Sequence, residues 1–126
     1  MPRNISVALL PITLAACASS SDKGPDLVVV CQAEITQGTS QVTVKRRYEV
    51  DTATGKVAES IDQGNGWTPE ATLQLQEVNR DRLVFSGGGV EGSNIDSQTG
   101  EYRQADGRGV ASGTCKKTAG KKLGRF

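Results

Sequence analysis

Apolar and polar residues alternate along much of this chain, so the hydrophobic pattern repeats every two residues rather than every 3.6. The alternation is clearest over residues 29–36, 42–50 and 72–76. In an extended strand, such alternation gives one apolar face and one polar face. The apolar face would carry Val29, Cys31, Ala33, Ile35, Val42, Val44, Tyr48, Val50, Leu73 and Leu75. We therefore expect β-strands, and no stretch of the sequence predicts a convincing amphipathic helix.

Turn residues separate the apolar runs at short intervals. They form the groups Gln37-Gly38, Gly64-Asn65-Gly66, Asn79-Arg80-Asp81, Gly87-Gly88-Gly89 and Asp106-Gly107. This spacing predicts an all-β fold, a small antiparallel meander of about seven or eight strands. The meander could close into a barrel or fold into a sandwich, and the pattern does not choose between them.

A turn motif, Asp-x-x-Thr-Gly, follows an apolar residue twice, at 50–55 and again 45 positions later at 95–100. The Asp side chain can accept hydrogen bonds from the turn backbone, and the Gly can take the positive φ that leads into the next strand. We expect a hairpin of defined register at each copy. The two copies could mark two similar halves of the domain, or simply reflect favourable turn chemistry.

The start of the chain has the features of an export signal. Arg3 precedes an apolar run, Ile5–Leu14, that is too short to span a bilayer. The next residues complete the sequence Leu14-Ala15-Ala16-Cys17, which resembles the lipobox of bacterial lipoproteins. This resemblance implies cleavage before Cys17 and acylation of that residue, which anchors the chain in a membrane. The alternative is an ordinary secretory signal, because Ala16-Cys17-Ala18 also fits the small-x-small cleavage rule.

The lipoprotein resemblance also implies a location and a division of the chain. Ala18, rather than aspartate, follows the lipidated cysteine. In lipoproteins this favours the outer membrane, facing the periplasm. We therefore expect a signal peptide at 1–16, a lipidated tether at 17–26, a β domain at 27–118 and a basic tail at 119–126.

Two cysteines remain once Cys17 is assigned to the anchor. An even number of thiols in an oxidising compartment predicts a disulfide between Cys31 and Cys115, near the first and last strands. The alternative is a pair of buried free thiols. The chain contains no histidine and no Cys-x-x-Cys sequence, so we expect neither a metal site nor a cofactor.

The residue content argues against an enzyme. Without histidine, the usual Ser-His-Asp and Cys-His arrangements cannot form. A pair of carboxylates could still hydrolyse sugars, but most of the glutamates fall on the polar side of the expected strands, where a solvated role is the simpler explanation. The glutamates in question, most of which fall on that side, are Glu34, Glu49, Glu59, Glu70, Glu77 and Glu101. The Gly-x-Gly-x-x-Gly sequence at 87–92 lacks the following helix of a dinucleotide site, so we interpret it as a loop or bulge.

Four residues are candidates for contact with a partner. Arg46 has the same parity as its apolar neighbours and would point inward, unless a bulge at 45–47 or the open end of a barrel returns it to solvent. Trp67 is expected in a loop, where it either plugs the core or contacts a partner. Lys121 and Lys122 belong to a basic, acid-free end that is either solvated or attracted to anionic envelope polymers. We expect no nucleic-acid partner.

In layout, the chain is similar to small envelope lipoproteins that include periplasmic lysozyme inhibitors, which are compact β-barrels bridged between terminal strands. Ser86-Gly87-Gly88-Gly89-Val90 lacks the tyrosine of the inhibitors' Ser-Gly-x-x-Tyr loop, so no inhibitory residue is carried over. It also resembles small exported β-proteins with repeated Asp-x-x-Thr-Gly turns. We therefore expect a non-enzymatic, lipid-anchored envelope protein with a binding or structural role. The alternatives are an inhibitor of a lysozyme-like hydrolase and a carboxylate-dependent cell-wall glycan hydrolase.

Overall fold

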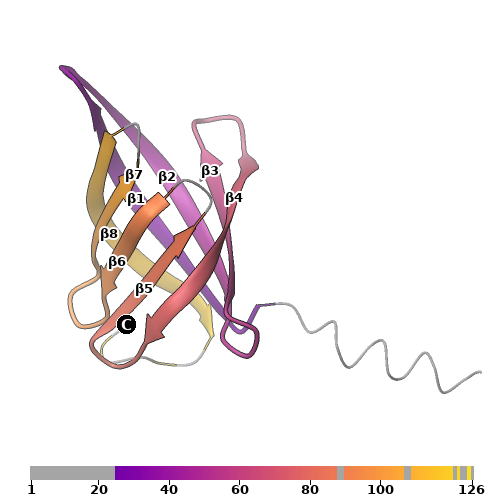
Figure 1. Cartoon of the computed structure of the whole chain (residues 1–126). Coiled ribbons are helices and arrows are strands. Elements are labelled where there is room, and N and C mark those ends of the chain that lie inside the picture. The colour runs from indigo at the N-terminus through magenta and orange to yellow at the C-terminus, as the bar shows by residue number, and fades with distance from the viewer. Residues whose placement is uncertain (1–24, 88–89, 107–108, 121, 123–124, 126) are drawn as a thin grey trace, which may run out of the picture.

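The fold is a closed, eight-stranded antiparallel barrel (Figure 1). The computed structural model describes residues 25–87, 90–106, 109–120, 122 and 125. The strands are β1 (Leu27–Gln37), β2 (Ser40–Asp51), β3 (Lys56–Asp62), β4 (Trp67–Val78), β5 (Arg82–Gly87), β6 (Val90–Asp96), β7 (Glu101–Asp106) and β8 (Gly109–Gly120). The expected all-β meander is confirmed, and it closes into a barrel rather than a sandwich. Within the described part of the chain, no helix is long and apolar enough to cross a membrane.

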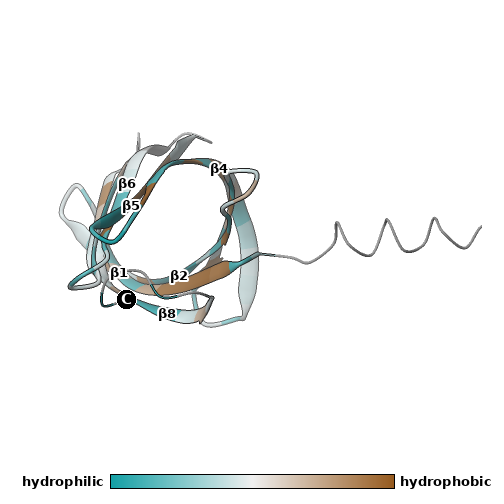
Figure 2. Cartoon of the chain, turned by 90° about the horizontal axis from the view of Figure 1, so that it is seen from below, coloured by the Kyte–Doolittle hydropathy of each residue, from teal (hydrophilic) through white to brown (hydrophobic). Residues whose placement is uncertain are grey.

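Consecutive strands pair with each other, and β1 pairs with β8 to complete the ring, which Figure 2 shows from one end. Each strand thus has a neighbour on both sides, so the barrel leaves no unpaired edge. The formal Gly-x-Gly-x-x-Gly sequence starts at the end of β5 and finishes in β6, and these two strands pair antiparallel. β8 ends at Gly120, two residues beyond the expected end of the domain.

Both Asp-x-x-Thr-Gly sequences form the expected hairpin turns. The Gly55 amide donates to the carbonyl of Asp51 at 2.8 Å, and the Gly100 amide donates to that of Asp96 at 2.7 Å. In each turn, the Asp carboxylate accepts hydrogen bonds from the amides two and three residues further on. The two glycines have φ of 80° and 83°, a region that L side chains rarely adopt. Because strand directions alternate, both turns lie at the end of the barrel where β1 begins (Figure 1).

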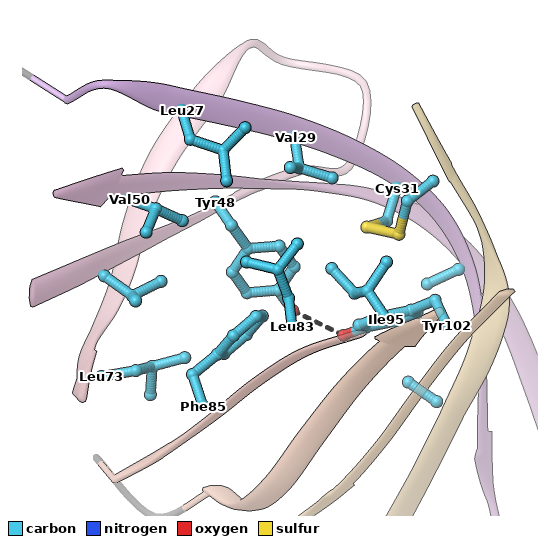
Figure 3. Packing of buried hydrophobic residues seen from close by; sticks show 14 of the residues in the cluster. Leu27, Val29, Cys31, Tyr48, Val50, Leu73, Leu83, Phe85, Ile95 and Tyr102 are labelled. Atoms are coloured by element: carbon cyan, nitrogen blue, oxygen red, sulfur yellow. Dashed lines mark hydrogen bonds between the residues drawn. A yellow bond between two sulfur atoms is a disulfide. The ribbon is translucent and has the colours of Figure 1, made fainter. Parts of the chain in front are cut away.

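The core fills the barrel interior, which in an eight-stranded barrel is just wide enough for side chains. Most of the residues that the sequence pattern places on the apolar face are buried, but Val42 is 53% exposed. Phe85 packs against Tyr48 with ring centroids 4.7 Å apart, and the ring of Tyr102 lies 5.9 Å from that of Tyr48 (Figure 3). The other buried apolar residues are Leu27, Val29, Cys31, Ala33, Val44, Val50, Val57, Leu73, Leu83, Ile95, Ala111 and Cys115.

Candidate functional site

A group of polar side chains lies inside the barrel, beside the aromatic core. Arg46 from β2 and Glu59 from β3 form an ion pair with 3.9 Å between Nη1 and Oε2, and their side chains are 6% and 3% exposed. Gln104 from β7 and Ser93 from β6 are also buried and join them. Tyr48 directs its hydroxyl into this group. We call Arg46, Tyr48, Glu59, Ser93, Tyr102 and Gln104 the interior network.

Hydrogen bonds in the interior network run in one direction, from the guanidinium to the carboxylate. The hydroxyl of Tyr48 donates to Glu59 Oε2 at 2.6 Å. A phenol has a single proton to donate, so Tyr102 must be the donor in the 2.5 Å contact between the two hydroxyls. The Tyr102 oxygen in turn accepts from Arg46 Nη1 at 3.0 Å. The resulting chain of bonds leads from Arg46 through both tyrosines to Glu59.

Gln104 connects the remaining members of the interior network. Its amide oxygen accepts a hydrogen bond from Arg46 Nη1. Its amide nitrogen lies 2.7 Å from the Ser93 hydroxyl and 3.0 Å from Glu59 Oε2. One polar atom of the network, Arg46 Nε, is buried without a hydrogen-bond partner. Most polar atoms of the interior network thus have hydrogen-bond partners within the network, and buried polar groups require such partners.

Burial and the neighbouring charges shift the pKa values of three network members. Burial raises the pKa of Tyr48 well above its usual value, and Tyr102 and Glu59 raise it further. Burial also raises the pKa of Tyr102 to about 12, against the opposing effects of Arg46 and of the hydrogen bond with Tyr48. Burial lowers the pKa of Arg46, but the two tyrosines and Glu59 outweigh it and raise the value overall. The tyrosines are therefore neutral and Arg46 is charged at neutral pH.

Arg46 lies where the strand parity predicts, inside the barrel. The proposed bulge is absent, because residues 45–47 pair in regular register with both β1 and β3. The alternative that Arg46 reaches solvent at the open end of the barrel is also wrong, since Arg46 is only 5% exposed. Glu59 departs from the surface role expected of the glutamates and is buried. Its parity with the inward-facing Val57 and Ile61 was a signal in the sequence that could have identified it.

Trp67 is the first residue of β4 rather than a loop residue. It is half-buried and lies outside the group of residues that form the core, so it does not plug the barrel. Arg47 stacks on its ring, with the guanidinium carbon 4.7 Å from the ring centroid. Such a cation–π contact contributes roughly 0.5–1 kcal/mol at exposed sites. Trp67 and Arg47 thus form an aromatic and cationic pair on the outer surface.

A shallow polar groove adjoins this pair. Cross-strand pairing places Gln32, Lys45, Asp62 and Trp67 in one row across β1, β2, β3 and β4. The first three of these line a depression of about 290 Å³, together with Thr43, Val44, Gln63 and Gly64. The outer groove, which we define as these seven lining residues, offers amide, hydroxyl, carboxylate and ammonium groups beside an aromatic ring. Small-molecule sites commonly combine an aromatic surface with a few polar groups.

The structure describes some of the remaining predicted site residues, while others lie outside the described part of the chain. Cys31 and Cys115 face each other on β1 and β8 and form a disulfide, as expected. Lys122 is exposed. Cys17 and Lys121 lie outside the described residues. Among the described residues, no group of three or more His, Cys, Asp or Glu side chains could hold a metal ion.

Comparison with known proteins adds no relationship: no protein-family model, curated protein or solved structure matches the chain.

Proposed function

We propose that this chain is a lipid-anchored bacterial envelope protein, held in the outer membrane and facing the periplasm, whose barrel has a non-enzymatic binding role. The Cys31–Cys115 bond supports export most directly, because structural disulfides form and persist in oxidising compartments such as the periplasm. The barrel also begins at Leu27, ten residues after the lipobox cysteine, which leaves a short tether between anchor and fold.

The outer groove beside Trp67 is the surface that best suits a partner. The core and the interior network occupy the interior of the barrel, so a ligand would bind on its outer surface. The groove presents hydrogen-bonding groups of several kinds from three strands. Tryptophan is enriched at binding surfaces because it gives a large contact area with a polar handle. This juxtaposition of Trp67 with the groove carries the proposal of a binding role.

The interior network suits a structural role better than a catalytic one. Glu59 accepts hydrogen bonds from Tyr48 and Gln104 and forms an ion pair with Arg46. A carboxylate engaged in this way inside a filled barrel is not presented to a substrate. The network holds β2, β3, β6 and β7 in register across the barrel, which supports a rigid binding scaffold.

Site-specific photo-crosslinking in native membranes tests the binding role. A photoreactive benzoylphenylalanine would replace Trp67, and in a control chain it would replace the exposed Arg103 on β7. We expect an adduct of defined mass from position 67 and none from position 103. Equal crosslinking from both positions would remove the support for a specific surface. An adduct with a lysozyme-like hydrolase would identify the protein as an inhibitor.

A further inference from the structure

A basic depression of about 340 Å³ lies where β8 passes the turn between β6 and β7. It is lined by Gln98, Thr99, Gly100, Cys115, Lys116, Lys117 and Arg125. Three of these seven residues are cationic, and none is acidic. We call this surface the basal depression, because it lies at the end of the barrel where β1 begins (Figure 1).

Backbone contacts build the floor and rim of the basal depression. The Cys115 amide donates to the Gly100 carbonyl at 2.7 Å, which ties β8 to the turn. A Cβ on Gly100 would lie 2.6 Å from the Cys115 carbonyl oxygen, so this close approach requires glycine. The Arg125 amide donates to the Ser97 carbonyl at 3.1 Å, which brings this basic residue back to the same turn.

The polar side chains of the turn already have hydrogen-bond partners. The Asp96 carboxylate accepts hydrogen bonds from the amides of Gln98 and Thr99. The Gln98 side chain donates to the Arg80 carbonyl at 2.7 Å. The ammonium of Lys117 donates to the Gly120 carbonyl at 3.0 Å, which fixes its position beside the depression and leaves it able to donate further.

We propose that the basal depression binds the phosphate of a phospholipid headgroup in the membrane that anchors the chain. Lysine and arginine are the usual partners of phosphate, through charge-assisted hydrogen bonds. The inference rests on the proposed anchoring, because a chain tethered ten residues before Leu27 holds this end of the barrel near the membrane surface. Bound headgroups would orient the barrel and keep the opposite end, with the outer groove, directed away from the bilayer.

A lipid titration with matched charge variants tests the inference. The full lipidated chain, in uncharged maltoside micelles, is titrated with short-chain phosphatidylglycerol, with uncharged diacylglycerol and with inorganic phosphate, while amide NMR shifts are followed. We expect saturable shifts at Gly100, Lys116 and Lys117 with phosphatidylglycerol alone. The variant Lys116→Gln/Lys117→Gln should lose affinity about tenfold. The control Lys56→Gln/Arg103→Gln removes the same charge from exposed positions outside the depression and should stay within about twofold.

Three results would overturn the headgroup site: no saturable shift, an equal loss of affinity in both variants, or equally tight binding of inorganic phosphate. The first leaves no site, the second indicates a diffuse charge effect and the third indicates a site for free phosphate. The same titration of the full-length Cys17→Ser chain separates this inference from the anchoring proposal. If the natural chain is found to carry no lipid and the Cys17→Ser chain still binds phosphatidylglycerol, the headgroup site is retained and the anchoring proposal is wrong.

Discussion

The hydroxyl oxygens of Tyr48 and Tyr102 lie 2.5 Å apart inside the barrel, although 54 positions separate the two residues in the chain. They are the only two tyrosines of the protein. Each is buried, and together they connect the Arg46 guanidinium to the Glu59 carboxylate. The barrel thus places all of its phenols in a single hydrogen-bonded chain, which makes their ionisation a direct probe of the interior.

The two tyrosines should ionise at higher pH in the folded protein than in the unfolded chain. Burial raises the pKa of Tyr102 to about 12 and that of Tyr48 well above its usual value. In the unfolded chain both pKa values are about 10. Between pH 10 and about 12 the folded state therefore holds more protons than the unfolded chain. The stability that the buried tyrosines contribute is fully present below pH 10 and is lost as the pH rises through about 12. Absorbance at 295 nm should show no phenolate in the native protein at pH 10, whereas a midpoint near 10 would contradict the buried network.

Removal of one charge from the interior ion pair should be strongly destabilising. Arg46→Met leaves Glu59 buried without its cation, and breaking such a pair costs roughly 3–5 kcal/mol. The double variant Arg46→Met/Glu59→Met should cost less than the sum of the single variants, because neither charge is left behind. Urea denaturation measures both. Arg103→Met, on the exposed side of β7, is the control and should change the free energy of unfolding by less than about 0.5 kcal/mol. Equal effects at positions 46 and 103 would show that the pair is not buried.

The disulfide should contribute a large share of the stability. Cys31 and Cys115 are 84 positions apart, and the loop-entropy relation gives about 4–5 kcal/mol for a loop of this size. Reduction should therefore lower the urea midpoint of the natural chain substantially. The variant Cys31→Ala/Cys115→Ala should start from the lower midpoint and show no response to reductant. A natural chain whose midpoint is unaffected by reductant would mean that the two thiols are not bonded.

Gly113 on β8 should tolerate no side chain. A Cβ there would lie 1.9 Å from the carbonyl oxygen of Gln32 on the neighbouring strand, so the backbone would have to move. We expect Gly113→Ala to cost about 1–3 kcal/mol, the range for overpacked sites. Gly92 is the matched control, since it too is a strand glycine and a Cβ added to it would meet nothing within 4 Å. Similar thermal midpoints for Gly113→Ala and Gly92→Ala would contradict the close β1–β8 pairing.

Much of the architecture was accessible from the sequence, because local rules determine it. Alternation over 42–50 identified the inward face of β2, including Arg46, and the two Asp-x-x-Thr-Gly turns behaved as their chemistry predicts. Barrel and sandwich could not be separated, because both use the same alternation. The choice depends on the pairing of β1 with β8, which are the most distant strands in the chain.

The site was less predictable, because charged residues and proline usually mark surfaces and loops. Glu59 was expected in solvent, since a buried carboxylate is rare without a partner. Tyr48 on the neighbouring β2 pairs directly with Glu59, but Gln104 comes from β7 and meets it only once the barrel closes. Trp67 was expected in a loop, because it lies in the sequence Gly64-Asn65-Gly66-Trp67-Thr68-Pro69. The strand accommodates this proline at a bulge, where the pairing with β3 shifts between Glu59 and Ser60.

The intact mass of the mature protein, purified from the membranes of its own cells, tests the proposed anchoring most directly. We expect a chain that begins at Cys17 and carries the added mass of a diacylglycerol and a further acyl chain. The Cys17→Ser chain should lack this addition and leave the membrane fraction. An unlipidated chain that begins at Ser19 would contradict the account, because the barrel would then be a freely secreted domain.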